Sequence, residues 1–392
     1  MDIMRRLLCL AIPIAACASA PHPVVQPAPT EQTIPVKATP AVASVSDTIK
    51  PLATLSRGWN RIPGRPGTGC AFDSVFAFRV RPGLPDKVMI LLNGGGACWR
   101  AQDCDPKGKP AYTMDADSAN DASVRTGVFD VSNPSNPVRD YTMVFVPYCT
   151  GDFHLGTREV DYDAKGTGGT TRTFAVRHGG AANVESALDW VYANIRSPRV
   201  IFVAGLSSGA PASPVYASKI ARHYPRARVI QLGDAAGGYR SPAAPSIFAA
   251  WGATDYLSDD PAFRSLDSAD FSFERLYLAP GRAAPRVRYA QYNAAEDAVQ
   301  LAVLAQLGVK NTPLPKLLAT NLGEIAERLA WFRSYTAPGR THTILRSNAL
   351  YTLTVGGVAF KDWLTGLLDG DPVEDVGSNL LQGAKKPVQK KK

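Results

Sequence analysis

The chain lacks the sequence signatures of several large protein classes. No internal repeat is evident in its 392 residues, and neither H-E-x-x-H nor G-x-G-x-x-G occurs. The motifs of helix-borne zinc proteases and of dinucleotide-binding folds are therefore absent. The stretch Gly166-Thr-Gly-Gly-Thr170 is rich in glycine but lacks the Walker lysine. We expect no strand before it either, so it predicts a surface loop.

More than half of the excess positive charge lies at the end of the chain. The formal net charge is +9, but five lysines fall within residues 385–392. This location predicts a solvated basic tail over 379–392 and argues against a nucleic-acid partner. The composition, 45% hydrophobic and 20% charged, is ordinary for a globular protein, and the length suffices for one large α/β core.

The N-terminal segment predicts export. Arg5 and Arg6 precede an apolar stretch, 7–16, that is too short to span a bilayer but suits a signal peptide. Ile14-Ala-Ala-Cys17 resembles a lipoprotein box, in which Cys17 is lipidated and anchors the chain to a membrane. Cleavage of an ordinary secretory signal after residue 20 is the alternative. We expect a signal at 1–17, a Pro/Ala-rich tether at 18–50 and a catalytic domain at 51–378.

Export changes the interpretation of the cysteines. Four remain outside the signal, namely Cys70, Cys98, Cys104 and Cys149. In an oxidising compartment an even number predicts two disulfides, and three pairings are possible. The short separation favours Cys98 with Cys104 and leaves Cys70 with Cys149. A metal site is the rival interpretation, but no histidine lies near these cysteines at ligand spacing.

Apolar runs alternate with helical patterns along the chain. Strands are predicted at 87–92, 141–147, 199–204, 227–232 and 287–292, and helices at 181–196, 208–224 and 294–307. This alternation predicts an α/β-hydrolase-like, mainly parallel sheet with helices on both faces. Residues 240–280 interrupt the alternation and predict a lid or pocket wall, and residues 313–335 predict one or two extra helices.

The strongest chemical motif follows the predicted strand at 199–204. Gly205-Leu-Ser-Ser-Gly209 matches G-x-S-x-G between a strand and a helix, a context that predicts an exposed nucleophile on a sharp turn. Ser207 holds the central position. The backbone N–H of Ser208 can donate to an oxyanion at the start of the helix.

A glycine triplet follows an earlier strand. Leu92-Asn-Gly-Gly-Gly-Ala-Cys-Trp99 lies where α/β-hydrolases place a second oxyanion donor. Bare amides at Gly94 and Gly95 can approach a substrate carbonyl that side chains would block. A bond between Cys98 and Cys104 would hold this loop still.

A serine nucleophile needs a base and an acid. The chain order serine, acid, histidine of this fold selects His342, because His154 and His178 precede the serine. His22 lies in the tether, and His223 ends a predicted helix, where it faces solvent. Asp297 is the expected acid because it lies between serine and histidine. Asp234 is the main rival, with bracing of its loop as its alternative role, and Glu296 would point away on the helix.

These residues together resemble the pectin acetylesterase family, which includes the animal carboxylesterase Notum. The resemblance runs from about residue 70 to 371. It rests on six stretches in family order: Cys70-Ala-Phe-Asp, the glycine triplet, Tyr148-Cys-Thr-Gly-Asp-Phe, the serine motif, Asn293-Ala-Ala-Glu-Asp and His342-Thr-Ile-Leu.

The family resemblance implies a serine esterase without a metal or other cofactor. It implies Ser207, Asp297 and His342 as catalytic residues, amides from Gly94, Gly95 and Ser208, and the bonds Cys98–Cys104 and Cys70–Cys149. Two departures lie beside the expected oxyanion hole. Asn93 stands where plant members carry glutamate, and Ser208-Gly-Ala where they carry Ala-Gly-Gly.

The sequence thus predicts an exported, lipid-anchored or secreted serine carboxylesterase acting on acyl esters, in the first place acetyl esters. Its expected partners are an ester substrate, such as an acylated polysaccharide, lipid or polyester, and a membrane. Two alternatives remain: a depolymerase or lipase for longer acyl esters, and a non-catalytic binding protein on the same fold.

Overall fold

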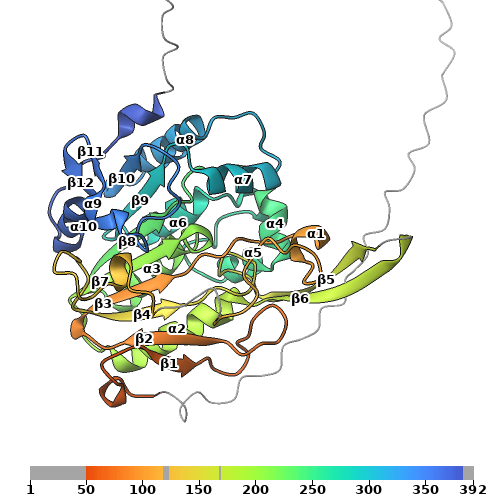
Figure 1. The fold of residues 1–392 in the computed structure, drawn as a ribbon, viewed down its shortest axis with the longest axis horizontal. Helices are drawn as coiled ribbons and strands as arrows, with labels where there is room; N and C mark the ends of the chain where they lie inside the picture. The colour runs from red at the N-terminus through yellow and green to blue at the C-terminus, as the bar shows by residue number, and fades with distance from the viewer. Residues whose placement is uncertain (1–49, 118–122, 167–168, 383–392) are drawn as a thin grey trace, which may run out of the picture. The chain divides into compact units, whose positions relative to one another are not determined.

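One mixed sheet of eight strands organises the protein in the computed structural model, in the spatial order β1-β2-β4-β3-β7-β8-β9-β10 (Figure 1). The strands from β4 to β10 run parallel, and β1 and β2 are antiparallel additions at one edge. This arrangement, with helices around it, confirms the predicted α/β-hydrolase-like sheet.

The structure describes residues 50–117, 123–166 and 169–382. The predicted signal at 1–17, with Cys17, lies outside the described residues, as do the tether up to residue 49, His22, and residues 383–392 of the predicted tail. Across the described ranges, no helix is both long and apolar enough to cross a membrane.

The elements have the following bounds. The strands of the main sheet are β1 (Asn60–Pro63), β2 (Ala77–Arg81), β3 (Leu84–Leu92), β4 (Tyr141–Val146), β7 (Val200–Leu206), β8 (Arg228–Asp234), β9 (Arg288–Ala294) and β10 (Phe332–Ala337). Two small sheets pair β5 (Arg158–Lys165) with β6 (Thr171–His178), and β11 (Thr354–Val355) with β12 (Val358–Ala359). The helices are α1 (Ala101–Cys104), α2 (Gly180–Asn194), α3 (Ser213–His223), α4 (Ala244–Ala250), α5 (Ala253–Ser258), α6 (Arg275–Ala283), α7 (Ala298–Gln306), α8 (Leu314–Ala326), α9 (Ala349–Thr352) and α10 (Phe360–Asp369).

Helices bury both faces of the sheet. On β3, Val88 and Ile90 pack into one hydrophobic cluster, and Met89 and Leu91 pack into a second one. Side chains of a strand alternate between the two faces, so the two clusters lie on opposite sides of the sheet. The first cluster includes residues of α2, α3, α6 and α8, and the second includes residues of α9 and α10. Burial on both faces explains why these strands are continuous apolar runs.

The predicted segment 313–335 contains a strand that we did not anticipate. Its first half is α8, but its end belongs to β10, which pairs in parallel with β9. The burial of β10 shows no alternation, because five of its six residues are buried. The sequence of β10 therefore lacks the period-two pattern that identifies a strand, and it closely follows a leucine-rich helical segment.

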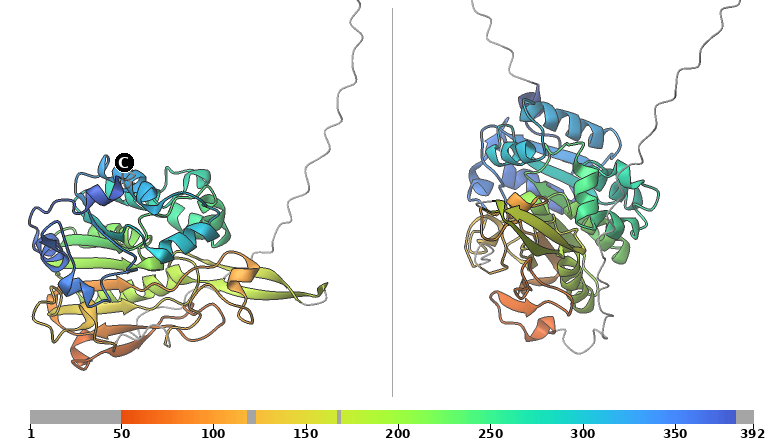
Figure 2. Two further views of the ribbon diagram at one scale, coloured as in Figure 1. Left: turned by 45° about the horizontal axis from the view of Figure 1, so that its top comes forward. Right: turned by 90° about the vertical axis from the view of Figure 1, so that its right-hand side faces the viewer.

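The prediction that no strand precedes residues 166–170 is wrong. The strand β5 ends at Lys165 and pairs with β6 as an antiparallel hairpin, which extends away from the main sheet (Figure 2). Val160 and Tyr162 alternate with charged residues in β5. That period-two pattern is the signal of a half-exposed strand, and it could have been recognised in the sequence.

Candidate active site

The predicted catalytic side chains follow neighbouring strands. The strands β7, β8, β9 and β10 are adjacent and parallel, so their carboxyl ends share one edge of the sheet. Ser207 directly follows β7, and Asp234 is the last residue of β8. Asp297 and His342 lie in the segments after β9 and β10. The topology therefore carries residues from far apart in the chain to one end of the sheet.

Ser207 occupies a tight turn that requires its two flanking glycines. The φ angle of Ser207 is +48°, in the left-handed region that L-residues seldom adopt. A β-carbon at Gly205 would lie 2.1 Å from the carbonyl oxygen of Gly209, and one at Gly209 would lie 2.3 Å from that of Leu92. Strand and turn can approach this closely only without those side chains, which is the geometry of a nucleophile elbow.

The glycine loop packs directly against this elbow. A β-carbon at Gly94 would lie 2.7 Å from both the β-carbon of Ser207 and the carbonyl oxygen of Leu206. A β-carbon at Gly95 would lie 2.7 Å from the ring of Tyr148. Gly94 is therefore needed for close contact with the elbow, and Gly95 for close contact with the Tyr148 ring.

Three carbonyl groups of the glycine loop accept hydrogen bonds from three different segments. The Asn93 carbonyl oxygen lies 2.8 Å from His154 Nε2. The Gly95 carbonyl accepts from the backbone N–H of Thr113 at 2.7 Å. The Gly96 carbonyl accepts from the Ser208 hydroxyl at 2.6 Å. The sequence assigned Ser208 a main-chain role only, and the structure adds this contact of its side chain.

Asp297 and His342 form a hydrogen-bonded pair. His342 Nδ1 lies 2.7 Å from Asp297 Oδ2. The Asp297 carboxylate is fully buried, and its Oδ1 caps α7 by accepting the backbone N–H groups of Val299 and Gln300. His342 Nε2 is buried and has no hydrogen-bond partner within the described ranges. One ring nitrogen is thus oriented by a carboxylate, while the other is available for a reacting group.

Asp234 contacts the histidine loop through its backbone. Its two carboxylate oxygens accept the N–H of Ile344 at 3.0 and 2.9 Å, and one of them accepts the N–H of Leu345 at 2.8 Å. Burial raises the pKa of the Asp234 carboxyl to about 7, although these N–H groups and His342 oppose that shift. Asp234 therefore has the bracing contacts that its alternative role predicts, and the carboxylate bonded to the imidazole is that of Asp297.

The other histidines have contacts of their own. His178 is buried, with Nδ1 2.9 Å from the Thr150 carbonyl oxygen and Nε2 3.0 Å from the Tyr162 hydroxyl. Burial lowers the pKa of His178 to about 4. His223 is exposed and stacks on Tyr192 with ring centroids 3.8 Å apart. Glu296, the neighbouring acid, is exposed.

Two disulfides border the site, Cys70–Cys149 and Cys98–Cys104. His178 lies close to the second one, with its ring nitrogen within 4.8 Å of both sulfur atoms. Sequence spacing missed this histidine, because it comes from β6, 74 residues beyond Cys104. Since the two sulfurs are bonded to each other, they offer no thiolates to a metal ion.

The segment 240–280 packs against the glycine loop. The indole N–H of Trp251, between α4 and α5, donates to the carbonyl oxygen of Cys98 at 2.8 Å. Trp99 packs edge-on against Trp251, with ring centroids 6.4 Å apart. The Arg158 guanidinium at the base of the hairpin donates to the Ala249 carbonyl at 3.0 Å. The insertion therefore joins the glycine loop to the hairpin.

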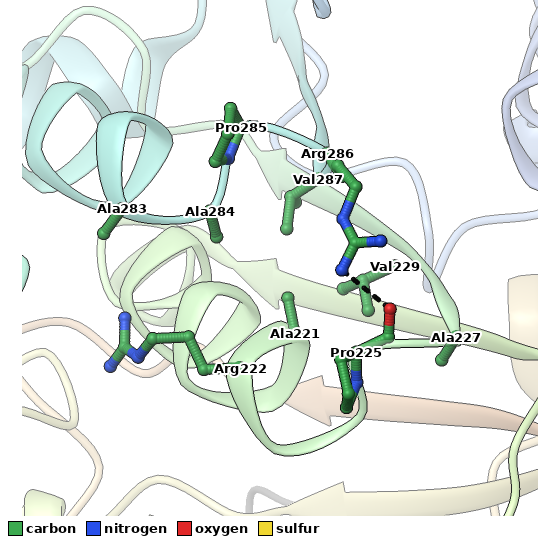
Figure 3. A pocket seen from close by; sticks show the side chains of 10 residues that line it. All are labelled: Ala221, Arg222, Pro225, Ala227, Val229, Ala283, Ala284, Pro285, Arg286 and Val287. Carbon is green, nitrogen blue, oxygen red and sulfur yellow. Dashed lines mark hydrogen bonds between the residues drawn. The ribbon is translucent and has the colours of Figure 1, made fainter.

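One cavity of the protein lies away from these residues. It has a volume of about 220 Å³ and lies between the ends of α3 and α6 (Figure 3). Its lining includes Ala227 and Val287, which directly precede β8 and β9. The Arg286 guanidinium donates to the Pro225 carbonyl there at 2.7 Å. Since strands β8 and β9 start at this cavity, it lies at the opposite end of the sheet from Ser207.

Comparison with known protein families gives one match. The family model described as Pectinacetylesterase matches residues 67–242. This range includes the glycine loop, the serine elbow and Asp234, and it ends before Asp297 and His342. No curated protein matches the chain in sequence.

Proposed function

Because the family model matches residues 67–242, we propose that the chain is a member of the pectinacetylesterase family and an exported serine carboxylesterase that hydrolyses acyl esters, foremost acetyl esters. The family supports a carboxylesterase in general terms. The observation that carries the serine mechanism is the Asp297–His342 pair, with an unpartnered Nε2 at the end of the sheet where the serine elbow lies. The two disulfides fit an oxidising compartment and so support export.

The position of the histidine loop supports a proton transfer between Ser207 and His342. Strand β10 is three strands away from β7, so a histidine directly above β10 would lie far from the serine. Asp234 stands beside Leu206 in the register of β7 and β8. Its bonds to Ile344 and Leu345 draw the loop after β10 back across the sheet toward the serine elbow.

In the proposed mechanism, the Ser207 hydroxyl attacks the ester carbonyl while His342 Nε2 takes its proton. Asp297 stabilises the imidazolium that forms. Backbone N–H groups of Gly94, Gly95 and Ser208 donate to the oxyanion of the tetrahedral intermediate. Collapse expels the alcohol with the proton from His342 and leaves an acyl-enzyme. A water molecule, deprotonated by His342, then attacks the acyl-enzyme, releases the carboxylic acid and restores the serine.

The exposed apolar surface of helix α7 supports a second class of substrate, namely esters with a longer acyl chain or another apolar part. None of its nine residues is charged, and Val299 and Leu301 are 41% and 40% exposed. These side chains follow Asp297 by two and four residues, beside the proposed catalytic pair. An exposed apolar surface next to the chemistry is suited to an apolar substrate, such as a lipid or polyester.

A fluorophosphonate probe tests the proposed function. We expect it to label the wild-type protein at Ser207, as peptide mapping would show, and Ser207→Ala to abolish labelling and hydrolysis of p-nitrophenyl acetate. Ser208→Ala is the matched control, because it keeps the backbone N–H and should still be labelled. A Ser207→Ala protein with wild-type hydrolysis would refute the assignment. An unlabelled wild-type protein would favour a binding function.

The same assay, run with acyl chains of increasing length, separates the two substrate classes. Rates that fall steadily beyond the acetyl ester support a deacetylase. Rates that rise with chain length, and that fall again toward the acetyl value in Leu301→Gln, support the apolar class.

A further inference from the structure

The first peptide unit of the glycine loop is held by a buried histidine. His154 Nε2 lies 2.8 Å from the carbonyl oxygen of Asn93. A carbonyl oxygen can only accept, so this nitrogen carries the hydrogen. In a planar trans peptide the C=O and N–H bonds point in opposite directions. The contact therefore also fixes the direction of the Gly94 N–H, the proposed oxyanion donor on the same peptide unit.

The backbone of His154 is itself held at both ends. Its N–H donates to Asp152 Oδ1 at 3.1 Å, and its carbonyl accepts from the Tyr216 hydroxyl at 2.7 Å. The Asp152 carboxylate also accepts the Thr150 hydroxyl at 2.7 Å and the Gly180 N–H at 2.7 Å. All of these groups are buried, so His154 has little freedom to shift.

The turn that presents this histidine is strained. Phe153 and His154 have φ angles of +54° and +61°, a region that residues with a β-carbon seldom adopt. Two successive residues in this conformation persist only where their surroundings hold them, and such strain clusters at functional sites. Burial lowers the pKa of His154 to about 4, so the ring is neutral in neutral solution and brings no charge to the loop.

We infer that His154 is a positioning residue of the oxyanion hole, which locks the Asn93–Gly94 peptide in the orientation that catalysis uses. This inference rests on the proposed function, because it assigns Gly94 as a donor to the oxyanion. Chain order excluded His154 as the base. The structure instead gives this histidine a contact with the loop that faces the nucleophile.

Two substitutions of His154 separate the lock from general stability. In glutamine the amide nitrogen is four bonds from the α-carbon, as is imidazole Nε2, so His154→Gln can still donate to Asn93. In asparagine it is three bonds away, so His154→Asn loses the contact. Asparagine, however, tolerates a positive φ better than glutamine does. If stability alone mattered, His154→Asn should therefore be the less damaged variant. If the hydrogen bond to Asn93, which we call the lock, matters for catalysis, His154→Gln should be the more active one.

The test measures kcat, KM and Tm for both variants with p-nitrophenyl acetate. Loss of a whole oxyanion donor costs about 100- to 1,000-fold in kcat, so a donor that is only released should cost about 10- to 100-fold. We expect that loss in His154→Asn, a smaller one in His154→Gln, and little change in KM. His178→Gln is the matched control: it alters an equally buried histidine that bonds Thr150 and Tyr162, and it should lower Tm with kcat preserved.

Equal kcat values in the two His154 variants, or a wild-type value in His154→Asn, would overturn the inference. If neither variant folds, Tyr216→Phe removes only the hydroxyl that bonds the His154 carbonyl. It should then lower kcat in a folded protein, and an unchanged kcat would count against the lock.

A failure of the proposed function is distinguishable, because wild-type protein would then escape fluorophosphonate labelling. In that case the Asn93 carbonyl direction in crystals of His154→Asn decides the lock on its own.

Discussion

At the scale of single residues, Asp297 combines two tasks in one carboxylate. One oxygen caps α7 and the other contacts His342, so the orientation of the imidazole depends on where the helix begins. Gln300 contributes to the same arrangement, since its side-chain amide donates to Asp297 Oδ2 at 3.2 Å. A carboxylate held from two directions cannot rotate away from the histidine.

We expect Asp297→Asn to lower kcat by about 10,000-fold, because an amide at this position favours the wrong imidazole tautomer. The change in Tm should be small, since asparagine is also a good helix cap. Glu296→Gln is the control, because it makes the same chemical change at an exposed neighbour. A kcat in Asp297→Asn within tenfold of the wild-type value would remove Asp297 from the proposed mechanism.

The sequence allowed us to propose the candidate catalytic residues, but not the contacts that hold them in place. Order along the chain and strand context were enough to propose Ser207, Asp297 and His342. The contact of His154 with Asn93 spans 61 positions, and that of Asp234 with Ile344 spans 110. Such contacts depend on strand order and on a strained turn, neither of which has a local pattern in the sequence.

At the scale of elements, the two disulfides constrain loops of very different length. Cys70 and Cys149 are 79 residues apart, whereas Cys98 and Cys104 are six apart and belong to the glycine loop and α1. A longer closed loop removes more entropy from the unfolded chain. The Cys70–Cys149 bond should therefore contribute mainly to the free energy of unfolding. The Cys98–Cys104 bond should mainly fix the position of the glycine loop.

Replacing both cysteines of each pair by alanine tests this division. From loop length alone, loss of Cys70–Cys149 should cost about 4.5 kcal/mol of unfolding free energy, and loss of Cys98–Cys104 about 2 kcal/mol. Urea unfolding measures both values. We expect the Cys98/Cys104 variant to lose more kcat per kcal/mol of lost stability than the other variant. The opposite ranking would show that the loop needs no covalent clamp.

At the scale of the whole molecule, four buried titratable groups near the site have opposing effects on how the free energy of unfolding changes with pH. Burial raises the pKa of Asp152 to about 6 and of Asp234 to about 7, and it lowers the pKa of His154 and His178 to about 4. As pH rises from about 4 to 6, the two acids bind more protons folded than unfolded, which lowers the free energy of unfolding. The two histidines bind fewer protons folded than unfolded over this range, which raises the free energy of unfolding.

Asp234→Asn should unbalance these contributions. Without this acid, the free energy of unfolding should rise with pH between 5 and 7 more steeply than in the wild-type protein, by about 1 kcal/mol per pH unit. Urea unfolding at pH 5, 6 and 7 measures the two slopes. Parallel curves for variant and wild type would contradict the raised pKa of Asp234.

The separation of the two ends of the sheet has a practical consequence. All of the proposed chemistry lies at the carboxyl ends of the strands, whereas the turn between α3 and β8 lies beside the cavity at the amino ends. Pro225 and Arg226 are exposed in that turn. A short affinity tag inserted between them would allow the enzyme to be immobilised on a support, with its working end directed toward the surrounding liquid.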